Sequence, residues 1–157
     1  MYERGKGSQP SDHVIHLLAT AARAADGLLT DLLADRGLSR LHQQVLQTLA
    51  EHGPHARPDL AAQVGATPEE TSGVVDDLLD KTLVTSMVVH AGGRQELVLL
   101  APPGQAALDH LQTDTGHVEA VLLTSLTKGE RSQLGYLLRR VCATAPARGR
   151  RKAVPGG

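Results

Sequence analysis

Near residue 83 the spacing of apolar side chains changes from a helical to a strand period, and this change restricts the fold more than any other property of the sequence. Before it, apolar residues recur every three or four positions, as on one face of a helix. After it, apolar runs at 83–89 and 96–101 flank a turn at 90–93 that contains Gly-Gly, a pattern typical of a β-hairpin. The sequence therefore predicts helices followed directly by a hairpin.

Three short helices precede the hairpin, and capping residues mark their ends. Ser39 is a preferred N-cap residue, and Gly53 ends the helix that it begins. Pro58 suits the first turn of a small helix that stops at Gly65. The run Thr67-Pro68-Glu69-Glu70 is a capping box, with Glu three residues after a Thr N-cap, and it starts the last helix before the hairpin.

Long helical patterns lie on both sides of this central unit. The first, with Ser11 or Asp12 as its N-cap and Gly37 as its stop, carries an apolar stripe in alternating steps of four and three, as in a seam between helices. Because a helix of about 24 residues needs a long surface to cover it, we expect a second subunit there. After a break at 102–104, a long helix is followed by a last helix that a second capping box opens at 127–130. The apolar positions expected to face inward are Val14, Leu18, Ala21, Ala25, Leu28 and Leu32, then Leu108, Leu111, Val118 and Leu122, then Leu134, Leu137, Leu138 and Val141.

These elements predict a mainly α fold with a small β-hairpin wing (α+β), that is, a winged helix-turn-helix with flanking dimerisation helices. Both ends of the sequence are rich in Gly, Pro and small or polar residues, as flexible tails are. The last segment carries four basic side chains, which suit either a non-specific DNA arm or a solubilising end. The expected organisation is a flexible N-terminal tail (1–10), a dimerisation helix (11–37), a winged helix-turn-helix DNA-binding domain (38–104), dimerisation helices (105–142) and a disordered basic tail (143–157).

Composition removes several classes of function. The 157 residues contain no Phe, no Trp and two Tyr, which excludes single-strand binders that stack bases on rings and aromatic cages for cations. A single cysteine, Cys142, excludes an intramolecular disulfide and is interpreted as a free structural thiol rather than an oxidant sensor. No apolar run approaches the roughly 20 residues of a membrane span, so we expect a cytoplasmic protein without a membrane partner. No phosphate loop, nucleophile elbow or convincing Ser/His/Asp set is present, so no enzyme is expected.

The central and C-terminal parts contain three recognisable stretches: LSRLHQQVLQTLAEHGPHARPDLAAQVGATPEETSGVVDDLLDKTLV, LVLLAPPGQAAL and LTKGERSQLGYLLRRV. They resemble the MarR (multiple antibiotic resistance regulator) type of transcription factor, and the resemblance covers about residues 12–142. It implies a homodimer joined through its first, fifth and last helices, with two winged helices that meet double-stranded DNA at a pseudo-palindromic site. It also implies a small-molecule pocket between the dimer arms and the winged helix, whose ligand changes the separation of the two heads.

The surface expected to touch DNA is poor in positive charge. Residues 38–104 carry four basic and eight acidic side chains, a net charge of −4, and the family's basic wing pattern is reduced to one arginine after Gly-Gly. Phosphate contacts supply most sequence-independent affinity, so these few cations have to carry it. The candidate DNA contacts are Arg94 at the hairpin tip, Arg57 and Arg40, together with Thr71, Ser72 and Gly73 on the recognition helix.

The pocket implied by the resemblance would be lined by Leu, Val and Ala, since rings are so rare. His16 and His42 are its expected polar contacts, and such a pocket suits a modest apolar ligand. An alternative from another class is a winged-helix protein that has lost DNA binding, in which the acidic helix 68–82 meets a basic protein surface or the pocket serves as a ligand-binding module.

Eight histidines raise the question of a metal site. His13 and His16 are three residues apart, and His110, Asp114 and His117 share one helix face, which are spacings that permit ligation. No HExxH or cysteine-containing set accompanies them, so solvated or interface histidines are favoured, and His16 and His117 at a dimer seam could sense pH. The sequence predicts neither a metal nor a cofactor.

Overall fold

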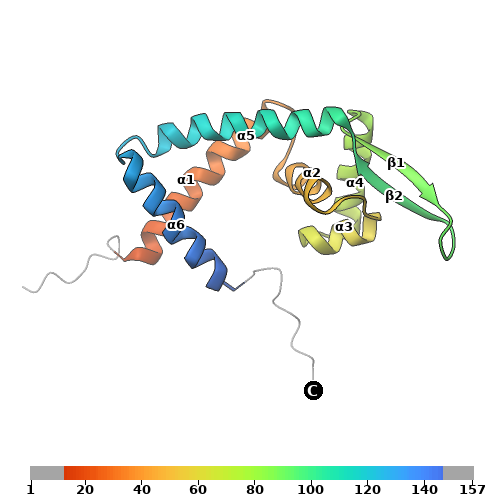
Figure 1. The fold of residues 1–157 in the computed structure, drawn as a ribbon, viewed down its shortest axis with the longest axis horizontal. Helices are drawn as coiled ribbons and strands as arrows, with labels where there is room; N and C mark the ends of the chain where they lie inside the picture. Colours follow the sequence, from red (N-terminus) through yellow and green to blue (C-terminus); the bar gives the residue numbers. More distant parts are fainter. Residues whose placement is uncertain (1–12, 147–157) are drawn as a thin grey trace, which may run out of the picture.

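The computed structural model describes residues 13–146 and has the predicted fold class. Its elements are α1 (Val14–Ala34), α2 (Arg40–His52), α3 (Arg57–Val64), α4 (Pro68–Asp80), β1 (Val84–Val89), β2 (Gln95–Leu100), α5 (Pro102–Leu122) and α6 (Lys128–Thr144). The long helix α5 runs from the base of the hairpin to the far end of the molecule, where α6 folds back (Figure 1). The helices α2 to α4 and the hairpin form a head at one end of α5, and α1 and α6 accompany its other end as an arm.

Some of the expected organisation lies outside the described residues. This applies to the tail at 1–10, to the proposed caps Ser11 and Asp12, and to residues 147–157 of the basic segment. The first helix begins at Val14, and its N-cap residue His13 makes no side-chain capping bond.

The predicted caps at Ser39, Thr67 and Thr127 are confirmed, because each side-chain oxygen accepts a hydrogen bond from the backbone N–H three residues on. After Thr127 the box is closed by a glutamate, as expected. After Ser39 it is closed by His42, whose Nδ1 lies 3.1 Å from the Ser39 amide nitrogen. The histidine at this position caps the N-terminus of α2 and also links α2 to α4.

The two strands pair as an antiparallel hairpin, so the predicted wing is confirmed with its edges shifted by one residue. Leu83 stays outside β1 because its N–H donates to the carbonyl of Leu78 at 3.0 Å and closes the end of α4. A bridge between His55 and Val98 adds a short third segment to the sheet, with N–H···O distances of 3.1 Å and 2.8 Å. The link at 55–57 therefore holds the base of the wing against the helices. The register runs from Val84 opposite Leu100 to Val89 opposite Gln95.

The hydrophobic core lies in the head and is built from leucine and valine. Burial of such a side chain stabilises a fold by about 1.5–3 kcal/mol, so these residues supply most of the driving force for the head. Leu108 and Leu111 of α5 belong to the same cluster and attach the arm to it. The fully buried side chains include Leu46, Leu60, Leu78, Val45, Val75 and Val98.

The arm buries far less of its apolar surface. Leu33 is the only buried residue of α1, and no residue of α6 is buried. Val14 is 70% exposed and Val121 74% exposed, and the expected inward positions Leu137 and Val141 are also exposed. Within one chain these positions are therefore not covered, and their burial against a second subunit stays a prediction. No helix within residues 13–146 is long and apolar enough to cross a membrane.

The run at 102–104 begins α5 instead of standing apart from it. Pro102 and Pro103 occupy the first helical turn, where proline is tolerated because its missing N–H would have no partner. Gly104 is buried against the end of α4, and a Cβ there would clash with the carbonyl oxygen of Leu83. This close approach fixes the angle at which α5 leaves the wing.

Candidate nucleic-acid interface

The recognition helix α4 has one face in the core and one toward solvent. Thr71 is 0% exposed and shares the buried face with Val74, Val75 and Leu78. Because these positions follow the helical period, Thr71 points inward, and the prediction that it contacts DNA is wrong. Its hydroxyl has no hydrogen-bond partner among the described residues. The face left accessible carries Glu69, Ser72, Gly73, Asp76 and Asp80.

Arg57, at the start of α3, points into a cluster of acceptors. Its Nη1 donates to Asp76 Oδ1 at 2.7 Å and to Ser72 Oγ at 2.9 Å, and its Nε donates to Glu96 Oε1 at 2.8 Å. Burial works to lower the pKa of Arg57, but the hydrogen bonds and charges of Glu96 and Asp76 raise that pKa above its ordinary value overall. The Arg57 charge and the Ser72 hydroxyl, both predicted to face DNA, are thus engaged with each other and with acids of the head.

Asp77 lies between two cationic or hydrogen-donating side chains. His42 Nε2 lies 2.8 Å from Asp77 Oδ2, and Lys81 Nζ lies 3.5 Å from the same oxygen. The hydrogen bond from His42, opposed by partial desolvation and aided by the charge of Lys81, lowers the pKa of Asp77 below its ordinary 3.8. Since the other ring nitrogen of His42 caps α2 at Ser39, both nitrogens are occupied. His42 is therefore a link between α2 and α4, and this engagement argues against the ligand contact expected of it.

These pairs change the electrostatics expected of the head. Asp76 and Asp77 have partners, so they repel phosphate less than bare carboxylates would, whereas Asp80 has no ion pair in the described part of the chain. The same pairs use the charges of Arg57 and Lys81. Fewer cations remain available to DNA than the sequence suggests.

Arg94 is exposed at the tip of the wing and makes no ion pair with any residue in 13–146. The turn before it places Gly92 at φ 73° and Gly93 at φ 120°, a conformation that favours glycine. The hairpin projects away from the helices (Figure 1), and Arg94 lies in the turn between its two strands. Arg40 is more engaged, because its Nη1 donates to Gln43 at 2.9 Å and its Nε lies 3.6 Å from an aspartate of α1.

Comparison with known proteins supports the resemblance seen in the sequence. No family model matches the sequence. The chain is 26% identical over 131 residues to the HTH-type transcriptional repressor NicR of Pseudomonas putida, covering 83% of each protein. It is similar to BpsR of Bordetella bronchiseptica, in a structure concerned with regulation of DNA binding by 6-hydroxynicotinic acid, with 25% identity, a TM-score of 0.63 and coverage of 85% of this chain and 96% of that one. The apo form of wild-type MarR from E. coli has the same fold, with 22% identity, a TM-score of 0.72 and coverage of 82% and 96%.

The chain is thus similar in sequence and in fold to MarR-type transcription regulators. The fold class and the MarR-type resemblance expected from the sequence are confirmed, and these likenesses support a MarR-type transcription regulator, a class of protein that is not enzymatic.

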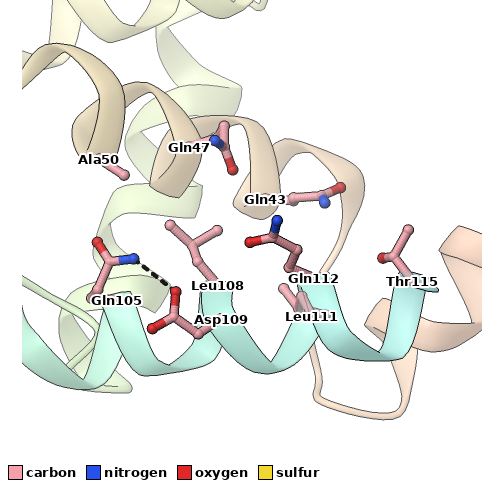
Figure 2. A pocket seen from close by; sticks show the side chains of 9 residues that line it. All are labelled: Gln43, Gln47, Ala50, Gln105, Leu108, Asp109, Leu111, Gln112 and Thr115. Carbon is pink, nitrogen blue, oxygen red and sulfur yellow. Dashed lines mark hydrogen bonds between the residues drawn. The ribbon is translucent and has the colours of Figure 1, made fainter. Parts of the chain in front are cut away.

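In this MarR-like chain a groove of about 340 Å³ lies between α2 and α5, where the head meets the arm. Figure 2 shows Gln43 and Gln47 on its α2 side, with Gln112, Leu108 and Leu111 on its α5 side. Neither His16 nor His42 lines this groove, whose polar side chains are mainly amides. The lining residues are Gln43, Gln47, Ala50, Gln105, Leu108, Asp109, Leu111, Gln112 and Thr115.

The sequence contains a signal for this groove that was missed. Gln43 and Gln47 are four residues apart on α2, and Gln105 and Gln112 are seven apart on α5, so each pair lies on one side of its helix. Such pairs are commonly solvated surface positions, and only the packing of α5 on α2 brings them together.

A second groove of about 400 Å³ lies between α1, α5 and α6 and is almost wholly apolar. His16 does not line it, and His117 lies instead in a hollow beside the ion pair between Arg36 and Asp114, whose N and O atoms are 2.7 Å apart. The side chains of this second groove are Leu18, Ala21, Ala22, Ala25, Leu29, Thr115, Val118, Glu119, Leu122, Leu123, Leu134 and Leu138.

The histidine spacings do not assemble a metal centre in the described part of the chain, where no three suitable side chains come together. His13 and His16 stack with their ring centroids 5.8 Å apart on the first turn of α1. Cys142 is a free, exposed thiol near the end of α6.

Proposed function

We propose that this MarR-type regulator is a homodimer that binds double-stranded DNA through α4 and the wing of each head. The observation that carries the proposal is a complete winged helix whose tip cation, Arg94, is exposed and free of an acidic partner in the described residues. A slim Gly-Gly-Arg tip suits the minor groove, whose negative potential attracts guanidinium groups.

The remaining contacts come from the accessible side of α4 and from α2. Gly73 is exposed, and no side chain stands between the helix backbone and an approaching duplex at this position. Arg40 at the first turn of α2 is the next cation, because its ion pair with Asp26 is long at 3.6 Å. The basic side chains beyond residue 146, which lie outside the described residues, would add sequence-independent affinity.

Dimerisation is supported by the apolar surface of the arm. The groove between α1, α5 and α6 offers almost no polar atoms, and Ile15 and Leu17 of α1 are more than half exposed. Contiguous apolar surface of this kind marks an interface. The segments expected at 11–37 and 105–142 would then join two copies and set the distance between their heads.

Ligand control is supported by the groove between α2 and α5. Two relatives at this level of identity are a repressor and a protein whose DNA binding is regulated by a small molecule. A ligand in the groove would touch the head through Gln43 and Gln47 and the arm through Gln105 and Gln112, so it would favour one angle between them. Because amides line the site, we propose a small ligand with several hydrogen-bonding groups in place of the apolar one expected from the sequence.

The test is fluorescence anisotropy with the DNA upstream of the regulator's own gene, measured across salt concentrations. We expect operator binding with a steep salt slope, and we expect Arg94→Ala to weaken it and lower the slope by about 1. Lys128→Ala, which removes an exposed charge from the start of α6 at the opposite end of the molecule, is the matched control and leaves both unchanged. Weak binding that does not respond to Arg94→Ala would contradict the proposal and favour the protein-interaction alternative.

A further inference from the structure

The guanidinium of Arg57 joins three elements of the head that the chain connects only through turns. It belongs to the first residue of α3 and donates hydrogen bonds to Ser72 and Asp76 of α4 and to Glu96 of β2. Ser72 takes part twice, because its carbonyl oxygen also lies 3.3 Å from Arg57 Nη1. No other side chain in the described residues makes hydrogen bonds to both the recognition helix and the wing.

The position of Glu96 gives this contact its consequence for the wing. Glu96 is two residues from Arg94, so the ion pair holds the strand just below the tip that carries the exposed cation. A two-stranded hairpin is marginally stable by itself and needs contacts to a larger body. The His55 bridge fixes the hairpin at Val98, and Arg57 fixes it at Glu96, two residues closer to the tip.

The carboxylates of Asp76 and Glu96 keep the Arg57 guanidinium in place. The Arg57 side chain is 25% exposed, whereas the carboxylates of Asp76 and Glu96 are 65% and 43% exposed. The guanidinium is therefore the inner member of the cluster, and its planar donors hold two carboxylates in a fixed geometry that the single ammonium of a lysine does not provide.

We propose that Arg57 is a positioning residue that sets the angle of the wing against α4, so that Arg94 and the exposed face of α4 meet the same DNA site. This inference rests on the proposed function, since the angle matters only if both elements bind DNA. It differs from a phosphate contact by Arg57, because in that case its partners Asp76 and Glu96 would compete with DNA for the same donors.

Two variants of Glu96 separate these roles. Glu96→Gln and Glu96→Ala remove the same charge, but only Gln keeps an oxygen that accepts from Arg57 Nε. If Arg57 positions the wing, Glu96→Ala binds the operator about tenfold more weakly than Glu96→Gln, as expected for one lost charge-assisted contact. If Arg57 contacts phosphate, both variants release it and both bind at least as tightly as the wild type, which would overturn the proposal.

Arg57→Lys supplies the second comparison, because it keeps the positive charge and loses the planar arrangement of donors of the guanidinium. We expect about tenfold weaker operator binding with an unchanged salt slope and unchanged affinity for non-operator DNA. A fall of the slope by about 1, or full operator affinity, would overturn the positioning role. Gln95→Ala, at the neighbouring exposed position of β2, controls for the loss of a long side chain from the strand.

Hydrogen exchange of the free protein makes the test independent of DNA. Glu96→Ala and Arg57→Lys should exchange faster than the wild type over residues 84–100, while Glu96→Gln and Gln95→Ala stay close to it. Equal exchange in all proteins overturns the assignment of Arg57 whatever the DNA result. A wild type that does not bind the operator, but whose hairpin loosens in Glu96→Ala, contradicts the proposed function and not the link.

Discussion

Single side chains in the head show how little room the fold leaves for polar groups without partners. The core is made of leucine and valine, and Thr71 is the one fully buried polar side chain among the described residues. Its hydroxyl loses water on folding and gains no hydrogen bond there. The buried hydroxyl therefore lowers the stability of the fold relative to an apolar group of the same shape, and its burial keeps it from contacting DNA.

The prediction for this residue is that Thr71→Val stabilises the protein. Valine has the same shape and no hydroxyl, so the free energy of unfolding should rise by about 1 kcal/mol. Urea denaturation at fixed protein concentration measures the change. Thr113→Val is the control, because that threonine is exposed on α5 and its hydroxyl donates to the Asp109 carbonyl at 3.2 Å. A loss of stability in Thr71→Val would show that the hydroxyl has a partner after all.

Asp77 gives the head an acid-sensitive contact. Its pKa is lowered by the hydrogen bond from His42, so the stability from this contact is present above the ordinary pKa and is lost as pH falls through the folded one. We expect the wild type to lose stability below about pH 4 more steeply than Asp77→Asn, so that the gap between them narrows as the pH falls. Thermal unfolding from pH 7 to pH 2 measures this. Asp80→Asn, which removes an exposed carboxylate without an ion pair in the described residues, should run parallel to the wild type.

Between helices and strands, the junction of the wing and α5 depends on one close contact. Gly104→Ala would place a methyl group against the Leu83 carbonyl, and we expect a loss of about 1–3 kcal/mol in the free energy of unfolding. Gly116→Ala is the matched substitution in the same helix, where a Cβ meets nothing within 4 Å, and it should stabilise by up to about 1 kcal/mol. Denaturation curves for the two variants should therefore move in opposite directions. A neutral Gly104→Ala would mean that α5 can tilt away from the wing.

Most elements could be predicted because their signals are local. The capping boxes at Thr67 and Thr127 and the Gly92-Gly93 turn are read from a few adjacent residues, and the structure keeps them. The contacts that decide how side chains are used join distant positions, such as Arg57 with Glu96 and His42 with Asp77, which are 39 and 35 residues apart. Periodicity says which face of a helix is buried, and it cannot say which acid meets which base across the fold.

The whole molecule is a well-packed head on an arm that has an uncovered apolar groove. Leu138 of α6 lines that groove and is 36% exposed in one chain, so a charge there would be buried on association. We expect Leu138→Asp to halve the mass measured by light scattering and to leave the head folded, because α6 contributes no residue to the core.

The same variant should lose operator affinity by tenfold or more, since the second head no longer binds at the high effective concentration that a shared arm provides. Gln133→Asp introduces the same group at an exposed position of α6 outside the groove and should remain dimeric with full affinity. A dimeric Leu138→Asp would place the interface elsewhere on the arm. A wild type that already has the mass of one chain would contradict the dimer, because the groove would then be open in solution and each head would have to bind DNA alone.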